Sequence, residues 1–285
     1  MKPAPFAYRR PATSEEAVTL LAEFAPQDGR VLAGGQSLVP IMNFRLARPG
    51  CLIDINGVSG LDRLAVESGL LHIGARVRHA AFERSVEAGP LGAMLTGVAR
   101  HIGHYPIRVR GTFCGSLAHA DPAAEWCLVA ATLDAELIAL SAEGERSIAA
   151  SNFFRGAMTT SLNPDELLTE ARLPILPPGT GFGFAEFSRR AGDFAMAMAL
   201  AVFEIDDGVI AAPRLGIAGA EPIPRRIEAA EAVLRGERPS ERLFRAAAET
   251  AATAIEPMED HETDARYRRD LVNAMAYCAL TQACA

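Results

Sequence analysis

The strongest constraint on the fold is a pair of glycine-rich stretches, residues 33–38 and 111–116, each of which follows apolar sequence and precedes a predicted helix. Glycine lets a backbone approach a ligand closely, and exposed N–H groups at the start of a helix attract an anion. The hydroxyl groups of Ser37, Thr112 and Ser116 add donors. Neither stretch matches GxGxxG or GxxxxGK(S/T), so a Rossmann fingerprint and a P-loop are absent. Together the two stretches predict a diphosphate site in another fold, although either one alone is typical of a tight turn.

Composition and charge narrow the class of protein. The chain has 285 residues, 49% of them hydrophobic and 22% charged, which is typical of a globular protein of one large or two moderate domains. The net charge of -7 has the wrong sign for broad contact with a phosphate backbone. Nucleic acid is therefore not expected as a partner.

The sequence also indicates in which cellular compartment the protein resides. The longest uncharged apolar stretch, residues 194–203, is about half of the roughly 20 residues that cross a bilayer, so no membrane span is expected. The N-terminal residues lack the apolar run of a signal peptide, which predicts a cytoplasmic protein. Five cysteines without a CxxC pair indicate free thiols rather than a disulfide framework or a zinc knuckle.

Helical and strand periodicities alternate in the first part of the chain. The prolines at 174, 177 and 178 interrupt them and mark the best domain boundary. Before this boundary, we expect helices at 14–24 (with Ser14 as N-cap), 38–46, 80–101 and 122–133, and strands at 30–32, 51–55, 70–73, 135–140 and 147–150. After it, we expect strands at 181–187, 196–205 and 209–218 and helices at 227–234, 240–255 and 266–283.

Other candidate sites are weaker. His101 and His104 have the spacing of two metal ligands on one helical turn, but Gly103 and Pro106 disfavour a regular helix there, so no metal site is assigned. Position 39 is valine, so Ser37 does not complete a GxSxG nucleophile elbow. His119 and Asp121 have the spacing of a dyad but fall inside the longer motif described next, and no catalytic residue is assigned.

Three separated stretches together resemble the FAD-binding medium subunit of the molybdenum hydroxylases, the family of carbon monoxide dehydrogenase and of the flavin part of xanthine dehydrogenase. They are AGGQSL at 33–38, the segment from Ile107 to Glu125 that contains RGTFCGSLAHADPAAE, and RRxGDFA at 189–195. The resemblance extends from Phe6 to Arg268 and so covers the whole chain.

The resemblance implies an α+β fold. It comprises a two-subdomain α/β FAD-binding module of the PCMH type over residues 1–176, with subdomains of about 1–58 and 59–176. A C-terminal α+β domain over residues 177–285 follows, with a three-stranded antiparallel sheet and helices.

The resemblance also implies which residues bind FAD. Both glycine-rich stretches would hold the diphosphate, Glu125 would lie near the nucleotide, Leu168 near the isoalloxazine and Ile102 toward the adenine. The full set of expected FAD-binding residues is Ala33, Gly34, Gly35, Gln36, Ser37, Leu38, Ile102, Gly111, Thr112, Cys114, Gly115, Ser116, Asp121, Glu125 and Leu168.

The sequence departs from the family pattern at two places. Phe113 and Cys114 stand where the family usually has a branched aliphatic residue and a glycine, so a thiol enters the second loop. We expect the Cys114 side chain to point away from the diphosphate, because a thiol between backbone and phosphate would displace close N–H contacts. Ala185 and Glu186 stand near the position where some relatives have a lysine that touches the flavin, so no such contact is expected.

The function implied by the resemblance is electron transfer by an FAD-carrying oxidoreductase subunit. Electrons would arrive from a small subunit with [2Fe–2S] clusters, which receives them from a large subunit with the molybdenum cofactor, in a dimer of heterotrimers. Two other functions stay open: a stand-alone flavoprotein oxidoreductase, and an FAD-free scaffold subunit. The organic substrate and the terminal acceptor, whether NAD, oxygen or a quinone, are not encoded in recognisable motifs of this chain.

Overall fold

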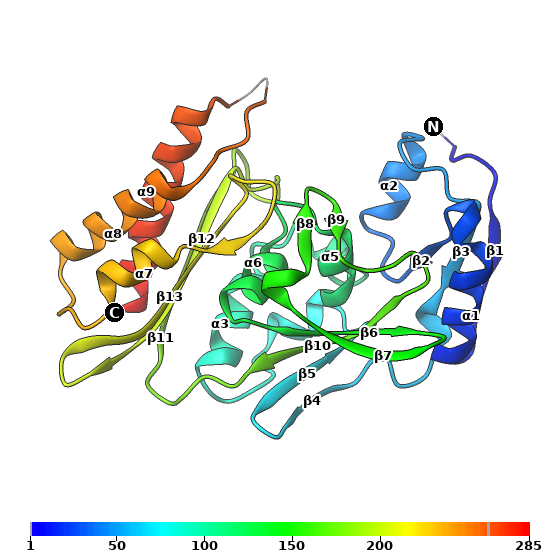
Figure 1. The fold of residues 1–285 in the computed structure, drawn as a ribbon, viewed down its shortest axis with the longest axis horizontal. Helices are drawn as coiled ribbons and strands as arrows, with labels where there is room; N and C mark the ends of the chain where they lie inside the picture. The colour runs from blue at the N-terminus through cyan, green and yellow to red at the C-terminus, as the bar shows by residue number, and fades with distance from the viewer. Residues whose placement is uncertain (1, 261–262) are drawn as a thin grey trace.

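The computed structural model describes residues 2–260 and 263–285, and its first sheet positions the first glycine-rich stretch (Figure 1). The sheet is parallel, with strand order β1-β3-β2. Its strands and helices are β1 (Ala7–Arg9), α1 (Ser14–Phe24), β2 (Arg30–Leu32), α2 (Leu38–Asn43) and β3 (Cys51–Asp54). Residues 33–37 link β2 to α2, so the first glycine-rich stretch lies at the carboxyl end of a parallel strand.

A five-stranded antiparallel sheet with the order β4-β5-β10-β6-β7 follows. Its strands are β4 (Leu64–Glu67), β5 (Leu70–Gly74), β6 (Glu136–Ser141), β7 (Gly144–Ala149) and β10 (Leu167–Pro174). Between β5 and β6 the chain forms α3 (Pro90–Ala99), α4 (Tyr105–Arg108), α5 (Phe113–His119) and α6 (Glu125–Thr132). The small hairpin of β8 (Phe154–Gly156) and β9 (Thr159–Thr160) precedes β10. The second glycine-rich stretch therefore lies at the junction of α4 and α5.

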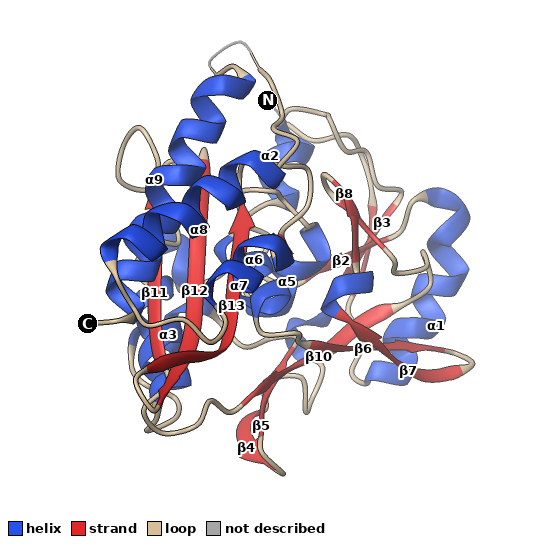
Figure 2. Ribbon diagram, turned by 60° about the vertical axis from the view of Figure 1, so that its left-hand side comes forward, coloured by secondary structure: helices blue, strands red, loops and turns tan. Residues whose placement is uncertain are grey.

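The third sheet is antiparallel and carries its own helices. Its strands are β11 (Gly181–Phe187), β12 (Ala197–Asp206), β13 (Val209–Ala218) and β14 (Arg225–Arg226), in chain order. One face of this sheet is covered by α7 (Glu228–Leu234), α8 (Glu241–Ala254) and α9 (Ala265–Ala283), as Figures 1 and 2 show.

Strand β12 joins two hydrophobic cores. Met198, Leu200 and Val202 are buried in the core that α3, α5, α6 and the five-stranded sheet also form. The alternate residues Ala199 and Phe203 are buried in the core under α7, α8 and α9. Successive side chains of a strand point to opposite faces, so one strand contributes to both cores. These methionine and aliphatic side chains of β12 therefore belong to the sheet core.

Most predicted elements are present within one or two residues of their expected bounds. The corrections have local causes. The N-cap of α1 is Thr13, whose Oγ1 accepts a hydrogen bond from the Glu16 N–H at 3.2 Å, rather than Ser14. The continuous helix expected at 80–101 is wrong: residues 79–83 form a short 3-10 turn, and α3 begins only at Pro90, directly after Gly89.

Some strands were not predicted. The largest omission is β10, which lies at the centre of the five-stranded sheet and pairs with both β5 and β6. The register shifts between Leu168 and Glu170, so Leu167 and Leu168 are both buried and the simple alternation is lost. The three-stranded antiparallel sheet is present as β11, β12 and β13, and the two-residue β14 extends its edge.

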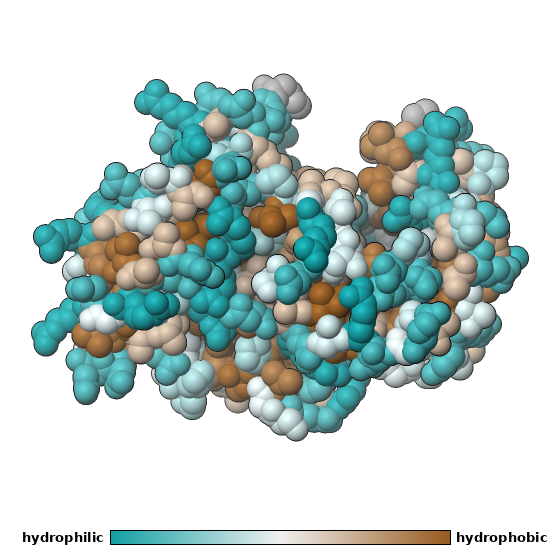
Figure 3. Space-filling view, viewed as in Figure 1, coloured by the Kyte–Doolittle hydropathy of each residue, from teal (hydrophilic) through white to brown (hydrophobic). Residues whose placement is uncertain are grey.

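Hydrophilic side chains cover much of the face in Figure 3, which is hollowed between the lobe that carries α2 and the part that carries β8 and β9. Across residues 2–260 and 263–285, none of the helices combines the length and apolar character needed to traverse a lipid bilayer.

Candidate FAD-binding site

Both glycine-rich stretches line one cavity of about 600 Å³, called here the main cavity. Residues of α2, β9 and α5 border it, which matches the hollow in Figure 3. Of the fifteen expected residues, those that line it are Ala33, Gly34, Gly35, Gln36, Ser37, Leu38, Gly111, Thr112, Cys114, Gly115, Ser116 and Leu168. The fold thus brings two stretches that are far apart in sequence to one concave site.

The first stretch presents unused backbone donors. Gly35 has a φ of +72°, a conformation that favours glycine, and the Gln36 side chain folds back to donate to the Gly34 carbonyl at 3.2 Å. Ser37 precedes α2 but its hydroxyl does not cap the helix. Within the described chain, no group accepts a hydrogen bond from the N–H of Gln36, Ser37 or Leu38. Such donors suit an anionic ligand.

The second stretch packs directly against the first. A Cβ built on Gly34 would lie 2.4 Å from the Arg110 carbonyl oxygen and 2.6 Å from the Gly111 Cα. Thr112 is the N-cap of α5, and its Oγ1 accepts a hydrogen bond from the Gly115 N–H at 3.1 Å. The Gly115 N–H is therefore already satisfied, and the second stretch offers fewer free donors than the first.

The two unusual side chains of the second stretch point into the protein. Phe113 is fully buried against Phe82 and Trp126, with ring centroids 5.6 and 4.9 Å away. The Cys114 thiol is 2% exposed, and its Sγ donates to the carbonyl oxygen of Ile73 at 3.4 Å. Burial raises the pKa of this thiol far above its usual value. The thiol thus points into the core beneath the loop, toward the Ile73 carbonyl.

We expect thiol reagents to label Cys114 at least about 100-fold more slowly than Cys278, because only a thiolate reacts and Cys278 is exposed. Cys114→Ala should retain FAD as well as the native chain, since the thiol contacts Ile73. Peptide mapping after timed labelling measures the labelling rate of each cysteine. The flavin content of the purified Cys114→Ala variant measures its retention of FAD. Fast labelling of Cys114, or loss of flavin in the variant, would reveal a role for the thiol at the ligand.

The remaining wall of the main cavity comes from residues 160–168. Glu166 fixes this segment: its side chain is 4% exposed, Arg146 pairs with it at 2.6 Å, and it accepts a hydrogen bond from the Asn163 N–H at 2.6 Å. The Arg146 guanidinium holds the pKa of the Glu166 carboxyl below its usual range. Leu168 follows at the start of β10 and lines the cavity.

Ile102, Asp121 and Glu125 lie outside the main cavity. Ile102 is 7% exposed and belongs to the hydrophobic core, and the Asp121 carboxylate accepts a hydrogen bond from the Ala123 N–H at 2.9 Å. Glu125 begins α6 and lies on the side of β11, where the charge of Glu186 acts on it. Glu125 therefore lies at the junction of α6 with the third sheet.

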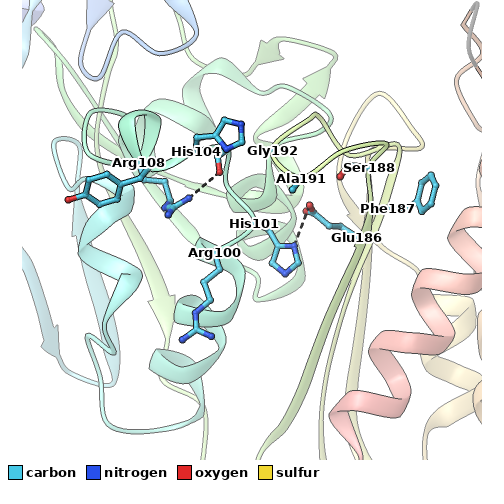
Figure 4. Close-up of a pocket in the computed structure, with 11 residues that line it drawn as sticks. Arg100, His101, His104, Arg108, Glu186, Phe187, Ser188, Ala191 and Gly192 are labelled. Carbon is cyan, nitrogen blue, oxygen red and sulfur yellow. Dashed lines mark hydrogen bonds and ion pairs between the residues drawn. The ribbon is translucent and has the colours of Figure 1, made fainter.

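A second cavity of about 450 Å³ opens beside the third sheet (Figure 4). The segment 100–108 lines one side and residues 186–192 the other. His101 Nδ1 lies 3.3 Å from Glu186 Oε1, whereas His104 points away from that pair and lies against Gly192. The other oxygen of Glu186, Oε2, is buried without a hydrogen-bond partner among the described residues.

His101 and His104 do not point toward a common position at which both could bind one metal ion. No three His, Cys, Asp or Glu side chains in the described part of the chain come together as a metal site would require. His119 lines the main cavity, whereas Asp121 does not. Among the described residues, the first pair therefore has no third metal ligand, and no hydrogen bond joins His119 to Asp121.

Burial raises the pKa of Glu125 to about 8, and the nearby carboxyls of Glu186 and Asp121 act in the same direction. The Glu125 carboxyl is thus neutral near pH 7. A neutral carboxyl at the start of α6 can donate a hydrogen bond as well as accept one.

Raising the pH from 5 to 9 should therefore destabilise the folded chain. The unfolded carboxyl of Glu125 ionises above about 4.5, whereas the folded one keeps its proton to about 8, so unfolding is favoured increasingly through this window. We expect the free energy of unfolding to fall by about 2 kcal/mol over this pH range. This is less than the whole pKa shift would give, because solvent reaches part of the Glu125 side chain. Urea unfolding at several pH values measures it.

Two variants check the assignment. Glu125→Gln should make the free energy of unfolding depend less on pH. Glu241→Gln is the matched control, because Glu241 also begins a helix but is exposed. Equal slopes for the native chain and Glu125→Gln would contradict the raised pKa.

Sequence reasoning missed His79, which lines the main cavity and contacts both the second stretch and Trp126. It also missed the wall at 160–167 and the residues near Asp28 on the opposite side. No local pattern marks these residues, because the folding of distant segments brings them to the site.

Comparisons with known proteins agree with this geometry. Residues 4–176 match the family described as the FAD binding domain in molybdopterin dehydrogenase, and residues 182–283 match the CO dehydrogenase flavoprotein C-terminal domain. The chain is 37% identical to the nicotine 6-hydroxylase medium subunit of Paenarthrobacter nicotinovorans over 99% of both chains. It is 31% identical to the carbon monoxide dehydrogenase medium chain of Hydrogenophaga pseudoflava, over 99% of this chain and 98% of that one.

Solved structures give the same result for the fold. Carbon monoxide dehydrogenase from Hydrogenophaga pseudoflava aligns with a TM-score of 0.95 at 33% identity. Quinoline 2-oxidoreductase from Pseudomonas putida 86 aligns with a TM-score of 0.92 at 35% identity. Each alignment covers 99% of this chain and 98% of the other chain.

Proposed function

Because the chain belongs to the FAD-binding medium subunits of the molybdenum hydroxylases, we propose that it holds FAD across its two glycine-rich stretches and passes electrons from an iron–sulfur subunit to an external acceptor. It is thus an oxidoreductase subunit. The observation that carries the proposal is the close packing of Gly34 on Gly111 at the wall of the main cavity.

The residues of the main cavity fit FAD. A Cβ at Gly34 would collide with the second stretch, and the N–H groups of Gln36, Ser37 and Leu38 are free to donate to diphosphate oxygens. The hydroxyls of Ser37 and Ser116 add neutral donors. FAD, when bound, supplies one- and two-electron redox chemistry. The chain itself would bind and orient the cofactor through these donors.

The other expected residues divide into two groups. Leu168 contributes an apolar wall within the main cavity. Ile102, Asp121 and Glu125 line neither the main cavity nor the second cavity, so their proposed contact with FAD rests on the resemblance to the family alone. The arrangement of the sheets supports a module of residues 1–176, with subdomains of about 1–58 and 59–176, and a C-terminal domain of residues 177–285.

The partners are proposed from the relatives. Two of the similar chains are named as the medium subunit of nicotine 6-hydroxylase and the medium chain of carbon monoxide dehydrogenase, and the matching family is that of molybdopterin dehydrogenases. These names support assembly with an iron–sulfur small subunit and a molybdenum large subunit. We propose a dimer of such heterotrimers in the cytoplasm. The five cysteines, all free, suit a reducing compartment.

Reconstitution tests the proposal. The isolated chain should bind FAD but show no reduction of that flavin by organic substrates, and substrate-dependent reduction should appear only when both partner subunits are added. Rapid reduction of the flavin by a substrate with this chain alone would support a stand-alone flavoprotein. A chain that neither retains nor takes up FAD would support a scaffold subunit.

A further inference from the structure

We propose that His79 is an additional FAD-binding residue, whose Nε2–H donates a hydrogen bond into the main cavity to an oxygen of the FAD diphosphate. The assignment rests on the proposed function, because it takes FAD as the occupant of the cavity. His79 lies outside both glycine-rich stretches, and nothing in the sequence pattern marks it as a ligand.

The first step concerns which nitrogen carries the proton. The indole Nε1–H of Trp126 donates to His79 Nδ1 at 2.9 Å, and both side chains are buried. An indole nitrogen is only a donor, so Nδ1 must act as the acceptor. The neutral imidazole therefore carries its hydrogen on Nε2. Trp126 thus fixes His79 in the tautomer that offers a donor on the opposite side of the ring.

The second step concerns where that donor points. A Cβ built on Gly111 would lie 2.5 Å from His79 Nε2, so this edge of the ring lies against the second glycine-rich stretch. The His79 N–H also donates to the Gly111 carbonyl at 3.0 Å, which fixes the two segments together. His79 is 4% exposed and lines the main cavity, yet none of the residues that the structure describes accepts a hydrogen bond from Nε2.

The third step concerns charge. Burial, together with the charges of Arg78 and Arg108, lowers the pKa of His79 to about 4. The ring is therefore neutral near pH 7 and keeps its bond from Trp126. The two arginines are held nearby, Arg78 through the Asn56 side chain at 2.6 Å and Arg108 through Glu83 at 2.7 Å. A donor without a partner at the wall of the main cavity, in a positive environment, suits a diphosphate oxygen.

The purely structural alternative is that His79 only supports Gly111. His79→Asn separates the two roles, because the shorter amide can still accept from Trp126 through an oxygen near the position of Nδ1 but has no atom at Nε2. If Nε2–H binds FAD, this variant should lose about 10- to 100-fold in FAD affinity while its unfolding by urea changes little. Gly97→Ala is the matched control, because nothing lies within 4 Å of its added Cβ.

A spectroscopic readout on the native chain does not depend on the variant. In long-range 1H–15N spectra of the FAD-free chain, the Nε2–H proton of His79 should move downfield and become protected from exchange when FAD is added. A merely structural histidine would show neither change. An unchanged Nε2–H at saturating FAD, or FAD affinity of a folded His79→Asn within about two-fold of native, overturns the assignment while leaving the proposed function intact. A native chain that fails to bind FAD overturns both.

Discussion

Replacing Gly34 by alanine is expected to abolish retention of FAD, with at least about a 100-fold loss of affinity. The added Cβ would lie 2.4 Å from the Arg110 carbonyl oxygen and 2.6 Å from the Gly111 Cα, and neither backbone atom can move without separating the two stretches. Separation displaces the N–H groups that face the diphosphate. Equilibrium titration of the apo-chain with FAD, followed by the change in flavin fluorescence, measures the loss.

The comparison variant for this prediction is Gly97→Ala. Gly97 lies within α3, and its added Cβ meets nothing within 4 Å, so this change should leave FAD binding unaltered and slightly favour the helix. The far-ultraviolet circular dichroism of Gly34→Ala should match that of the native chain, because the change is confined to a loop contact. Native-like flavin affinity in Gly34→Ala would show that the packing of the two stretches does not shape the site.

Gly183→Val should produce the largest loss of stability, about 3 kcal/mol or more. Gly183 lies on β11 beneath α9, where an added Cβ would be 2.0 Å from the Ala279 carbonyl oxygen and 2.7 Å from the Gln282 Cβ. The helix backbone itself fills the space, so α9 must be displaced from the sheet. Urea unfolding followed by circular dichroism measures the effect.

Gly156→Val serves as the strand control for Gly183→Val. Gly156 ends β8, and the nearest atom to its added Cβ is the Thr159 Cβ at 3.9 Å. This control should change the free energy of unfolding by less than about 1 kcal/mol. If both variants unfold alike, the close approach of α9 to β11 does not stabilise the C-terminal domain.

Damage at β11 should also reach the flavin site. Because β12 contributes side chains to the core under α9 and to the core of the FAD-binding module, we expect displacement of α9 to disturb the face that carries Met198 and Leu200. The shared strand would then couple the two parts of the chain.

Local patterns were sufficient where one segment determines its own structure. The hairpin of β12 and β13 follows from Asp207 and Gly208, which both have positive φ and form the turn between the two strands. The two glycine-rich stretches could be identified as one site because each has its own turn and helix signal. Their direct contact at Gly34 and Gly111 could not, because it depends on packing between separate segments.

The rest of the site depends on contacts that are distant in sequence. The role of His79 depends on Trp126, which lies on α6, and the raised pKa of Glu125 depends in part on Glu186 of β11. Strand β10 was missed because a bulge removes its alternation and because its last residue, Pro174, belongs to the proline cluster that marked the boundary. Sequence periodicity reports on single elements, and these features arise between elements.

The cofactor content of the natively purified complex tests the central claim most directly. The account predicts that this chain co-purifies with two other subunits, that the particle contains one FAD per copy of this chain, and that iron and molybdenum are present in the same particle. The flavin should remain with this chain when the subunits are separated under mild conditions. A complex without flavin, or flavin that remains with another subunit after separation, would contradict the account.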